Sequence, residues 1–313
     1  MNATLLEHEA RRDALCQNLD SLPPLPSTVI GLASLPEDER QFFSYLKEIV
    51  ERDPTLLAHL VASAAAIGEP LPFEIDIEGL LQALGRSRIE GLIIAETMTR
   101  VLVPRSAAHR NLWLHSIQVA SAASHIATSC PGLGVKPGHA YLTGLLHDLG
   151  RFLMFRNTPN ELACVEESDY QHPEEMMAAE MDIFGMTHTA VGAIVCAEWD
   201  IHQDISDAIS RHHTPPNPEF DTPDVINLLS ILRQADGLSF YMMSDAAKAR
   251  PAAPLAELCQ IVDGFCEGRL WPKPPMSRDG LIKMLPDVRI ESTRKSRLAM
   301  GDVLNESRGA GRF

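Results

Sequence analysis

The sequence predicts an all-α protein, because helix-start signals and helical spacing of apolar residues recur along the chain, whereas the alternating pattern of strands is scarce. Of the 313 residues, 45% are hydrophobic, which is enough to bury a large core. The pair Asp53-Pro54 illustrates the start signal, since Asp can cap a helix and Pro is tolerated at its first position. The length fits one large domain or two of about 150 residues.

Several segments carry the spacing expected of a helix with one buried face. In the segment that begins at residue 111, Leu112, His115, Val119 and Ala122 fall on one stripe. The same reasoning predicts helices over residues 111–130, 141–155, 190–199, 205–210 and 225–243.

Proline-rich segments predict how the chain is divided. The segment VPRS at 103–106 separates an N-terminal helical lobe, residues 1–105, from a second lobe, residues 106–245. The segment TPPNP at 214–218 interrupts the second lobe, because proline cannot extend a helix. Residues 246–313 are expected to be a C-terminal extension of unknown role, and its basic run at 289–297 is expected to be a solvated tail.

The charge balance argues against nucleic acid as the main partner. Lys and Arg number 27 against 42 Asp and Glu, so the formal net charge is -15. Such a chain repels phosphate backbones unless it gathers a basic face, and aromatic residues that could stack on bases make up only 5%.

A soluble, cytoplasmic protein without a membrane partner is expected from three further features. The N-terminus is charged and lacks the apolar stretch of a signal peptide. The longest nearly apolar run, residues 56–67, is shorter than the roughly 20 residues that span a bilayer. The six cysteines are scattered without a CxxC pair, which suits a reducing compartment.

Histidines and aspartates inside apolar helices are the most informative feature of the chain. His147 and Asp148 lie in the segment GLLHDLGR at 144–151, and Asp236 interrupts the apolar pattern of residues 228–235. Burying an unpaired carboxylate is costly, so each Asp needs a cation, a set of hydrogen bonds or a metal. His115 lies on an apolar stripe, His188 at an expected helix start, and the pair His212-His213 at a helix end.

Five histidines and two aspartates on several helices could converge on one or two divalent ions. Imidazole is the commonest metal ligand, and a carboxylate can bridge two ions, which would activate a shared water and offset charge on a phosphoryl group. Taken singly, His115 also fits a hydrogen-bonded core residue, His212-His213 a partner of a helix C-terminus, and Asp236 a locally paired carboxylate. Spacing alone leaves these alternatives open.

The order of these residues resembles the HD superfamily of metal-dependent phosphohydrolases. Motifs across residues 20–243 narrow the resemblance to the HDOD branch, which implies an all-helical bundle with an N-terminal lobe and a role in signalling. These motifs are LPPLP at 22–26, IVERDP at 49–54, ALG at 83–85, WLHS at 113–116, GLLHDLG at 144–150, Glu180, FGMTH at 184–188, VGA at 191–193, Trp199 and AISRHH at 208–213.

The resemblance implies a role for each candidate residue. Asp148 would be the carboxylate that bridges two ions and is central to catalysis. Glu180 would be a further ligand or a group that orients His188. One ion would be held by His115, His147 and Asp236, and the other by His188, His212 and His213.

The ligand order is also similar to that of the HD-GYP cyclic-di-GMP phosphodiesterases, but this chain departs from them. The segment TPP at 214–216 follows the histidine pair where a GYP tripeptide would be expected. Arg151 stands where those enzymes usually carry a Lys that contacts phosphate, and Arg keeps the charge while adding a bidentate fork. HDOD proteins often have decayed ligands, whereas this chain keeps the full set.

Two functions follow from the resemblance. The first is a metal-dependent phosphohydrolase or phosphodiesterase acting on a phosphorylated small molecule or a nucleotide. The second is a non-catalytic signalling scaffold that binds a partner protein. A His-rich site with a bridging carboxylate favours iron or manganese, with five- or six-coordinate geometry, and zinc and nickel are the alternatives.

Overall fold

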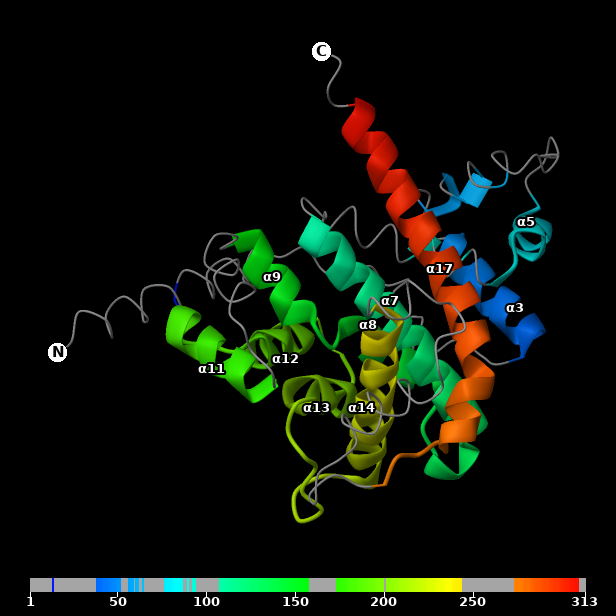
Figure 1. The fold of residues 1–313 in the computed structure, drawn as a ribbon. Coiled ribbons are helices and arrows are strands. Elements are labelled where there is room, and N and C mark those ends of the chain that lie inside the picture. The colour runs from blue at the N-terminus through cyan, green and yellow to red at the C-terminus, as the bar shows by residue number, and fades with distance from the viewer. Residues whose placement is uncertain are drawn as a thin grey trace.

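The protein is described by a computed structural model that covers residues 13, 38–51, 56–58, 60–61, 64, 76–86, 89, 92–93, 107–157, 173–199, 201–243 and 273–309. Every regular element in these ranges is a helix, which confirms the predicted all-α class (Figure 1). None of these helices is long and apolar enough to cross a membrane. The elements are α3 (Glu39–Val50), α5 (Ile77–Leu84), α7 (Ala107–Ser129), the 3-10 helix η1 (Pro131–Leu133), α8 (Pro137–Leu146), α9 (Leu149–Asn157), α11 (Pro173–Phe184), α12 (His188–Glu198), α13 (Gln203–Arg211), α14 (Pro223–Met243) and α17 (Arg278–Gly309).

Four of the predicted helices are confirmed with small shifts at their ends, as α7, α12, α13 and α14. The single helix predicted over 141–155 is wrong, because the chain turns at His147 and Asp148 and forms two helices, α8 and α9. The start signal at 53–54, the segment LPPLP at 22–26 and the boundary at 103–106 lie outside the described residues.

Helix α7 lies at the centre of the described helices. It packs against α8, α14 and α17, while α12 packs against α9 and α13 (Figure 1). Buried apolar residues of α7, α8, α9 and α12 form one core with buried residues of α3 and α5, among them Phe42 and Leu81. Described residues on both sides of the predicted boundary at 103–106 therefore share one hydrophobic core.

The basic run at 289–297 is not a solvated tail, contrary to the prediction. It belongs to α17, whose Leu281, Met284 and Val288 are buried at helical spacing in a core shared with α7 and α14. The same face continues to Lys295, which is 1% exposed, while Arg294 on another face is exposed. The buried face was not recognised in the sequence because it includes a lysine, whose aliphatic stem can pack as an apolar group.

Polar contacts anchor the buried lysine of α17. Its Nζ lies 2.6 Å from Oε1 of Glu291 and 4.3 Å from the centre of the Tyr141 ring. The Oε2 atom of Glu291 lies 2.7 Å from Nε2 of His125 on α7. Although burial opposes ionisation of Glu291, His125 and Lys295 lower its pKa to about 2. The C-terminal helix is therefore held to α7 by an ionic cluster as well as by apolar packing.

Two glycines explain how the turn between α8 and α9 fits into the bundle. A Cβ at Gly144 would lie 2.8 Å from the backbone of Ala120 on α7, and a Cβ at Gly150 would lie 1.9 Å from the carbonyl oxygen of His188. Only glycine permits these approaches. They bring His147 and Asp148 between α7 and α12.

Candidate metal centre

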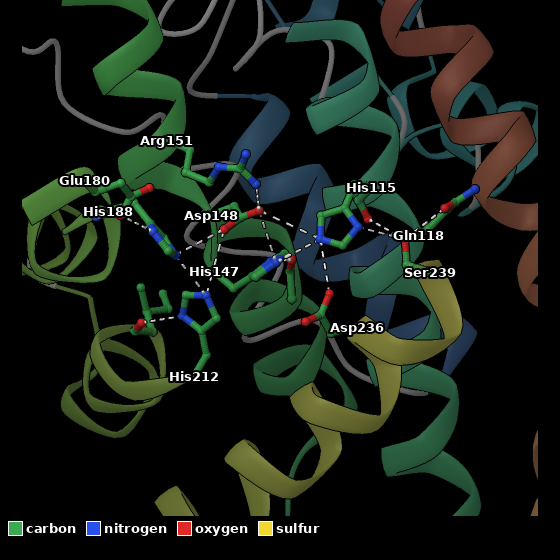
Figure 2. Close-up of polar contacts among 12 residues, drawn as sticks. His115, Gln118, His147, Asp148, Arg151, Glu180, His188, His212, Asp236 and Ser239 are labelled. Atoms are coloured by element: carbon green, nitrogen blue, oxygen red, sulfur yellow. Dashed lines mark hydrogen bonds and ion pairs between the residues drawn. The ribbon is translucent and has the colours of Figure 1, made fainter. Parts of the chain in front are cut away.

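Side chains from five helices and two turns converge between α7, α12 and α14 (Figure 2). His147 and Asp148 come from the turn between α8 and α9, at the centre of the group. His188 is the first residue of α12, where the Thr187 side chain caps the helix by accepting from the amide of Ala190. The remaining members are His115 on α7, Asp236 on α14, Arg151 on α9, Glu180 on α11, and His212 and His213 after α13.

The two oxygens of the Asp148 carboxylate face different pairs of histidines. Its Oδ1 lies 3.6 Å from Nε2 of His188 and 3.8 Å from Nε2 of His212. Its Oδ2 lies 3.6 Å from Nε2 of His147 and 3.8 Å from Nε2 of His115. Figure 2 shows the carboxylate between the two pairs. This is the arrangement that a carboxylate needs to bridge two cations.

Each of these four histidines has a partner for its Nδ1 atom, so that Nε2 is left facing the centre. Two of the partners are backbone carbonyls, which can only accept, and therefore keep a proton on Nδ1. The contacts are His147 to the Gly144 carbonyl at 2.8 Å, His212 to the Ile209 carbonyl at 2.7 Å, His188 to Glu180 Oε2 at 2.7 Å, and His115 to Ser239 Oγ at 2.9 Å.

The Nε2 atoms meet in pairs at the distances expected of ligands on one ion. They are 3.2 Å apart in His115 and His147, and 3.3 Å apart in His188 and His212. Ligand nitrogens about 2.1 Å from an ion lie roughly 3.0–3.4 Å from each other. Unprotonated nitrogens at this distance repel, whereas a cation between them is attracted to both lone pairs. The donor set therefore fits a divalent cation at each pair.

His213 adds a further buried donor beside the His188–His212 pair. Its Nε2 atom is buried and has no hydrogen-bond partner among the described residues. The His213 ring lies 4.0 Å from the ring of His212 and 5.2 Å from that of His188, measured between centroids. A buried nitrogen without a partner is costly, and a nearby cation would satisfy it.

The electrostatics of the site favour the protonation states that metal ligands require. Burial lowers the pKa of His147 and His213, and lowers that of His212 to about 3, so these rings stay neutral. Burial opposes ionisation of Asp148, but His147 and Arg151 hold the pKa of this carboxyl well below its usual value. Neutral imidazoles and an ionised carboxylate are the binding forms of these ligands.

The His115 side of the centre is the more open one. The side chains of His115 and Asp236 are each 16% exposed, whereas that of His188 is completely buried. Oδ1 of Asp236 lies 3.3 Å from Nε2 of His115. Burial lowers the pKa of His115, but Asp236 outweighs it and raises this pKa above its ordinary value. A cation bound on this side would therefore displace a proton from His115.

Arg151 lies on the same open side. One of its guanidinium nitrogens is 3.6 Å from Oδ2 of Asp148, and the side chain is 15% exposed. It is one helical turn beyond Asp148, as the i, i+3 spacing predicts.

The structure gathers the predicted ligands into two tight groups that share Asp148. Asp236 is outside both groups, with its Oδ1 beside Nε2 of His115. Glu180 is outside them as well, because its Oε2 accepts from both the backbone amide and the ring of His188. Of its two predicted roles, the geometry therefore favours orientation of His188. The groups are Asp148, His188, His212 and His213, and His115, His147 and Asp148.

Sequence reasoning missed three residues that shape the site. Gly150 sets the distance between α9 and α12, while Ser239 and Gln118 form a hydrogen-bonded pair behind His115. Ser239 comes three residues after the predicted ligand Asp236 on α14, and Gln118 comes three residues after the predicted ligand His115 on α7. That spacing places them on the same helix face and is the signal that could have found them.

The fold and the site define an all-helical protein with a buried His/Asp cluster that suggests a divalent metal. The family model of the HDOD domain matches residues 22–215, more than half of the chain, and this protein belongs to the HDOD family.

Solved structures share this fold. A candidate phosphohydrolase from Shewanella amazonensis SB2B is 20% identical, with a TM-score of 0.61, and the match covers 91% of this chain and 98% of that one. An HDOD domain protein of unknown function from Geobacter sulfurreducens is 19% identical, with a TM-score of 0.57, over 93% and 98% of the two chains. A candidate signal transduction protein from Marinobacter aquaeolei VT8 is 22% identical, with a TM-score of 0.57, over 93% and 66%.

Curated relatives match at similar sequence identity but over smaller shares of their own length. An uncharacterised protein of Treponema pallidum is 21% identical over 73% of this chain and 45% of its own length. Ribonuclease Y of Dehalococcoides mccartyi is 25% identical over 61% of this chain and 26% of its own length. The chain thus spans less than half the length of these curated relatives.

Proposed function

We propose that this protein is an HDOD signalling protein with a retained divalent-metal centre that hydrolyses a phosphate ester of a small molecule or nucleotide. The observation that carries the proposal is the position of Asp148, whose two oxygens face separate histidine pairs. A carboxylate that only stabilised the fold would need no more than its cationic partner, Arg151, whereas this one also faces two pairs of histidines.

In this proposal the ligands divide as the two tight groups do. His115, His147 and Asp148 would hold one ion, and Asp236 would complete or orient that set through His115. His188, His212 and His213 would hold the other ion together with Asp148. Iron or manganese remain the favoured metals, because a bridging carboxylate and several imidazoles suit five- or six-coordinate ions.

The residues on the open side would handle the substrate. When bound, a pair of divalent ions supplies Lewis-acid stabilisation of a phosphoryl group and activates water for attack. Arg151 would bind phosphate oxygens through two parallel hydrogen bonds of its guanidinium, which lies next to Asp148. The burial of His188 and His212 keeps bulk water away from the opposite side.

The test is hydrolysis by the metal-loaded protein and by Asp148→Ala. Substrates would include a phosphomonoester, a linear dinucleotide and a cyclic dinucleotide. The wild type should turn over at least one of these, and Asp148→Ala should abolish turnover while helical content is retained. Asp182→Ala, which removes an exposed carboxylate from α11, is the matched control and should leave turnover unchanged.

A second candidate function is a signalling scaffold in which the metal has a structural role only. The complete burial of the His188 side chain favours it, because a closed metal position stabilises a fold without admitting substrate. A metal-loaded protein that is inert toward all three substrates would support this second function and contradict the first.

A further inference from the structure

Behind His115 lies a short chain of hydrogen bonds that connects α7 to α14. Nδ1 of His115 is 2.9 Å from Oγ of Ser239, and this hydroxyl donates to Oε1 of Gln118 at 2.9 Å. Ser239 is completely buried and Gln118 is 8% exposed. Both are therefore shielded from water that could replace these bonds.

The direction of these two hydrogen bonds sets the tautomer of His115. A carbonyl oxygen such as Oε1 of Gln118 only accepts, so it takes the single hydroxyl proton of Ser239. The Ser239 oxygen is then left as an acceptor for a proton on Nδ1 of His115. In the neutral ring the lone pair is consequently on Nε2, the atom that faces His147, Asp148 and Asp236.

His115 differs in this respect from the other three histidines. His147 and His212 are fixed by backbone carbonyls within their own local segments, and His188 by the carboxylate of Glu180. Only the His115 ring depends on a neutral side chain from another helix. Moreover, α14 and Ser239 lie beyond residue 215, where the HDOD family match ends.

We propose that Ser239 and Gln118 are positioning residues that hold His115 in its Nε2-binding tautomer and thereby control metal occupancy of the open position only. The inference rests on the proposed metal centre and deepens it. The two metal positions then differ in their dependence on Ser239 and Gln118, because the histidines of the closed position, His188 and His212, are held by Glu180 and the Ile209 carbonyl.

The experiment is a titration of the metal-free full-length protein with Mn²⁺, following the free ion by its EPR signal. The wild type should show two positions. Ser239→Ala should weaken one of them by about 10–100-fold, the usual effect of losing the partner of a metal-binding histidine, and leave the other unchanged. Ser230→Ala is the matched control, because it removes a buried hydroxyl of α14 that donates to the Ile226 carbonyl of the same helix. It should leave both positions unchanged.

Two variants of Gln118 separate positioning from packing. Gln118→Glu keeps an acceptor for the Ser239 hydroxyl, whereas Gln118→Leu removes it at nearly the same size. The inference expects Gln118→Leu to weaken Mn²⁺ binding at one position and Gln118→Glu to leave Mn²⁺ binding unchanged. A purely structural role predicts the reverse order, because a buried charge disturbs a core more than a leucine does.

A second measurement does not depend on metal. The ¹⁵N chemical shifts of the His115 ring in metal-free protein at pH 9 report which nitrogen carries the proton. The wild type should carry it on Nδ1, and Ser239→Ala should shift it toward Nε2. Equal tautomers in both proteins, or equal Mn²⁺ affinities, would overturn the inference. A wild type that binds no Mn²⁺ but shows the tautomer shift would instead reject the proposed function and keep the positioning role.

Discussion

His188 and His212 place their Nε2 atoms 3.3 Å apart in a buried part of the bundle, although each ring already donates through Nδ1 to an acceptor. When both rings are neutral, this contact sets two lone pairs against each other. The Nε2 atoms of His115 and His147 also lie close together, 3.2 Å apart. We therefore expect the metal-free protein to be under electrostatic stress at this centre, and the predictions below measure its consequences.

The metal-free protein should lose stability as the pH falls from about 6.5. Burial lowers the pKa of His212 to about 3, so the unfolded chain takes up a proton below the ordinary value of 6.5 while the folded chain does not until about pH 3. The loss should approach 1.4 kcal/mol per pH unit for this residue alone. Urea unfolding in a chelator at several pH values measures it.

In that experiment His212→Gln should reduce the pH dependence, because the variant has no imidazole to protonate. His202→Gln serves as its control, since the His202 side chain is 58% exposed. Equal slopes for the wild type and His212→Gln would show that His212 is not buried as a neutral ring.

Replacing Arg151 should affect phosphate binding without removing metal. Arg151→Ala should weaken the binding of inorganic phosphate to the loaded protein by about 1.5–3 kcal/mol, the range for a charged hydrogen bond. Calorimetric titration measures the affinity, and elemental analysis checks that the metal content is kept. Unchanged phosphate affinity would leave Arg151 only as the partner of Asp148 that the 3.6 Å contact describes.

Gly150→Ala should destabilise the protein and displace His188. The added Cβ would lie 1.9 Å from the His188 carbonyl oxygen, so α9 and α12 would have to separate. Such overpacking typically costs 1–3 kcal/mol. Thermal unfolding compares this variant with Gly132→Ala, where an added Cβ meets nothing within 4 Å. If both variants melt alike, the close approach of the two helices is incorrect.

The ionic cluster on α17 predicts a pH-dependent contribution to stability. The pKa of Glu291 is lowered from its ordinary value of 4.5 to about 2. At pH values above 4.5 the ionised carboxylate therefore stabilises the folded protein, and this stabilisation is lost as the pH falls to about 2. Glu291→Gln should cost about 1–3 kcal/mol at pH 7, since Lys295 keeps a buried charge without its partner.

Denaturant unfolding at pH 7 and near pH 2 tests this dependence, with Asp287→Asn, an exposed carboxylate of the same helix, as the control. The difference between Glu291→Gln and the wild type should shrink at the lower pH. A constant difference would mean that ionisation of Glu291 does not contribute.

Much of the fold could be predicted because helical periodicity is a local property of the chain. The turn at His147 and Asp148 could not, since the apolar spacing of 141–155 continues through it and the break depends on how Gly144 and Gly150 pack against other helices. Helix α17 was missed for a related reason, because the environment of Lys295 is supplied by Tyr141 and Glu291.

The candidate ligands and their division into two sets were expected from the family resemblance, whereas the spacing of the residues alone leaves their pairing open. Which histidines share an oxygen of Asp148 depends on contacts between helices that are far apart in the sequence. The supporting bonds of His115 depend in the same way on Ser239 meeting Gln118, 121 residues away.

The most direct test of the account is the metal content of the full-length protein after purification without chelator and after reconstitution. The account predicts one or two divalent transition-metal ions per chain, with iron or manganese preferred over zinc. Fewer than about 0.2 ions per chain, even after reconstitution, would contradict the metal centre on which the proposed function depends.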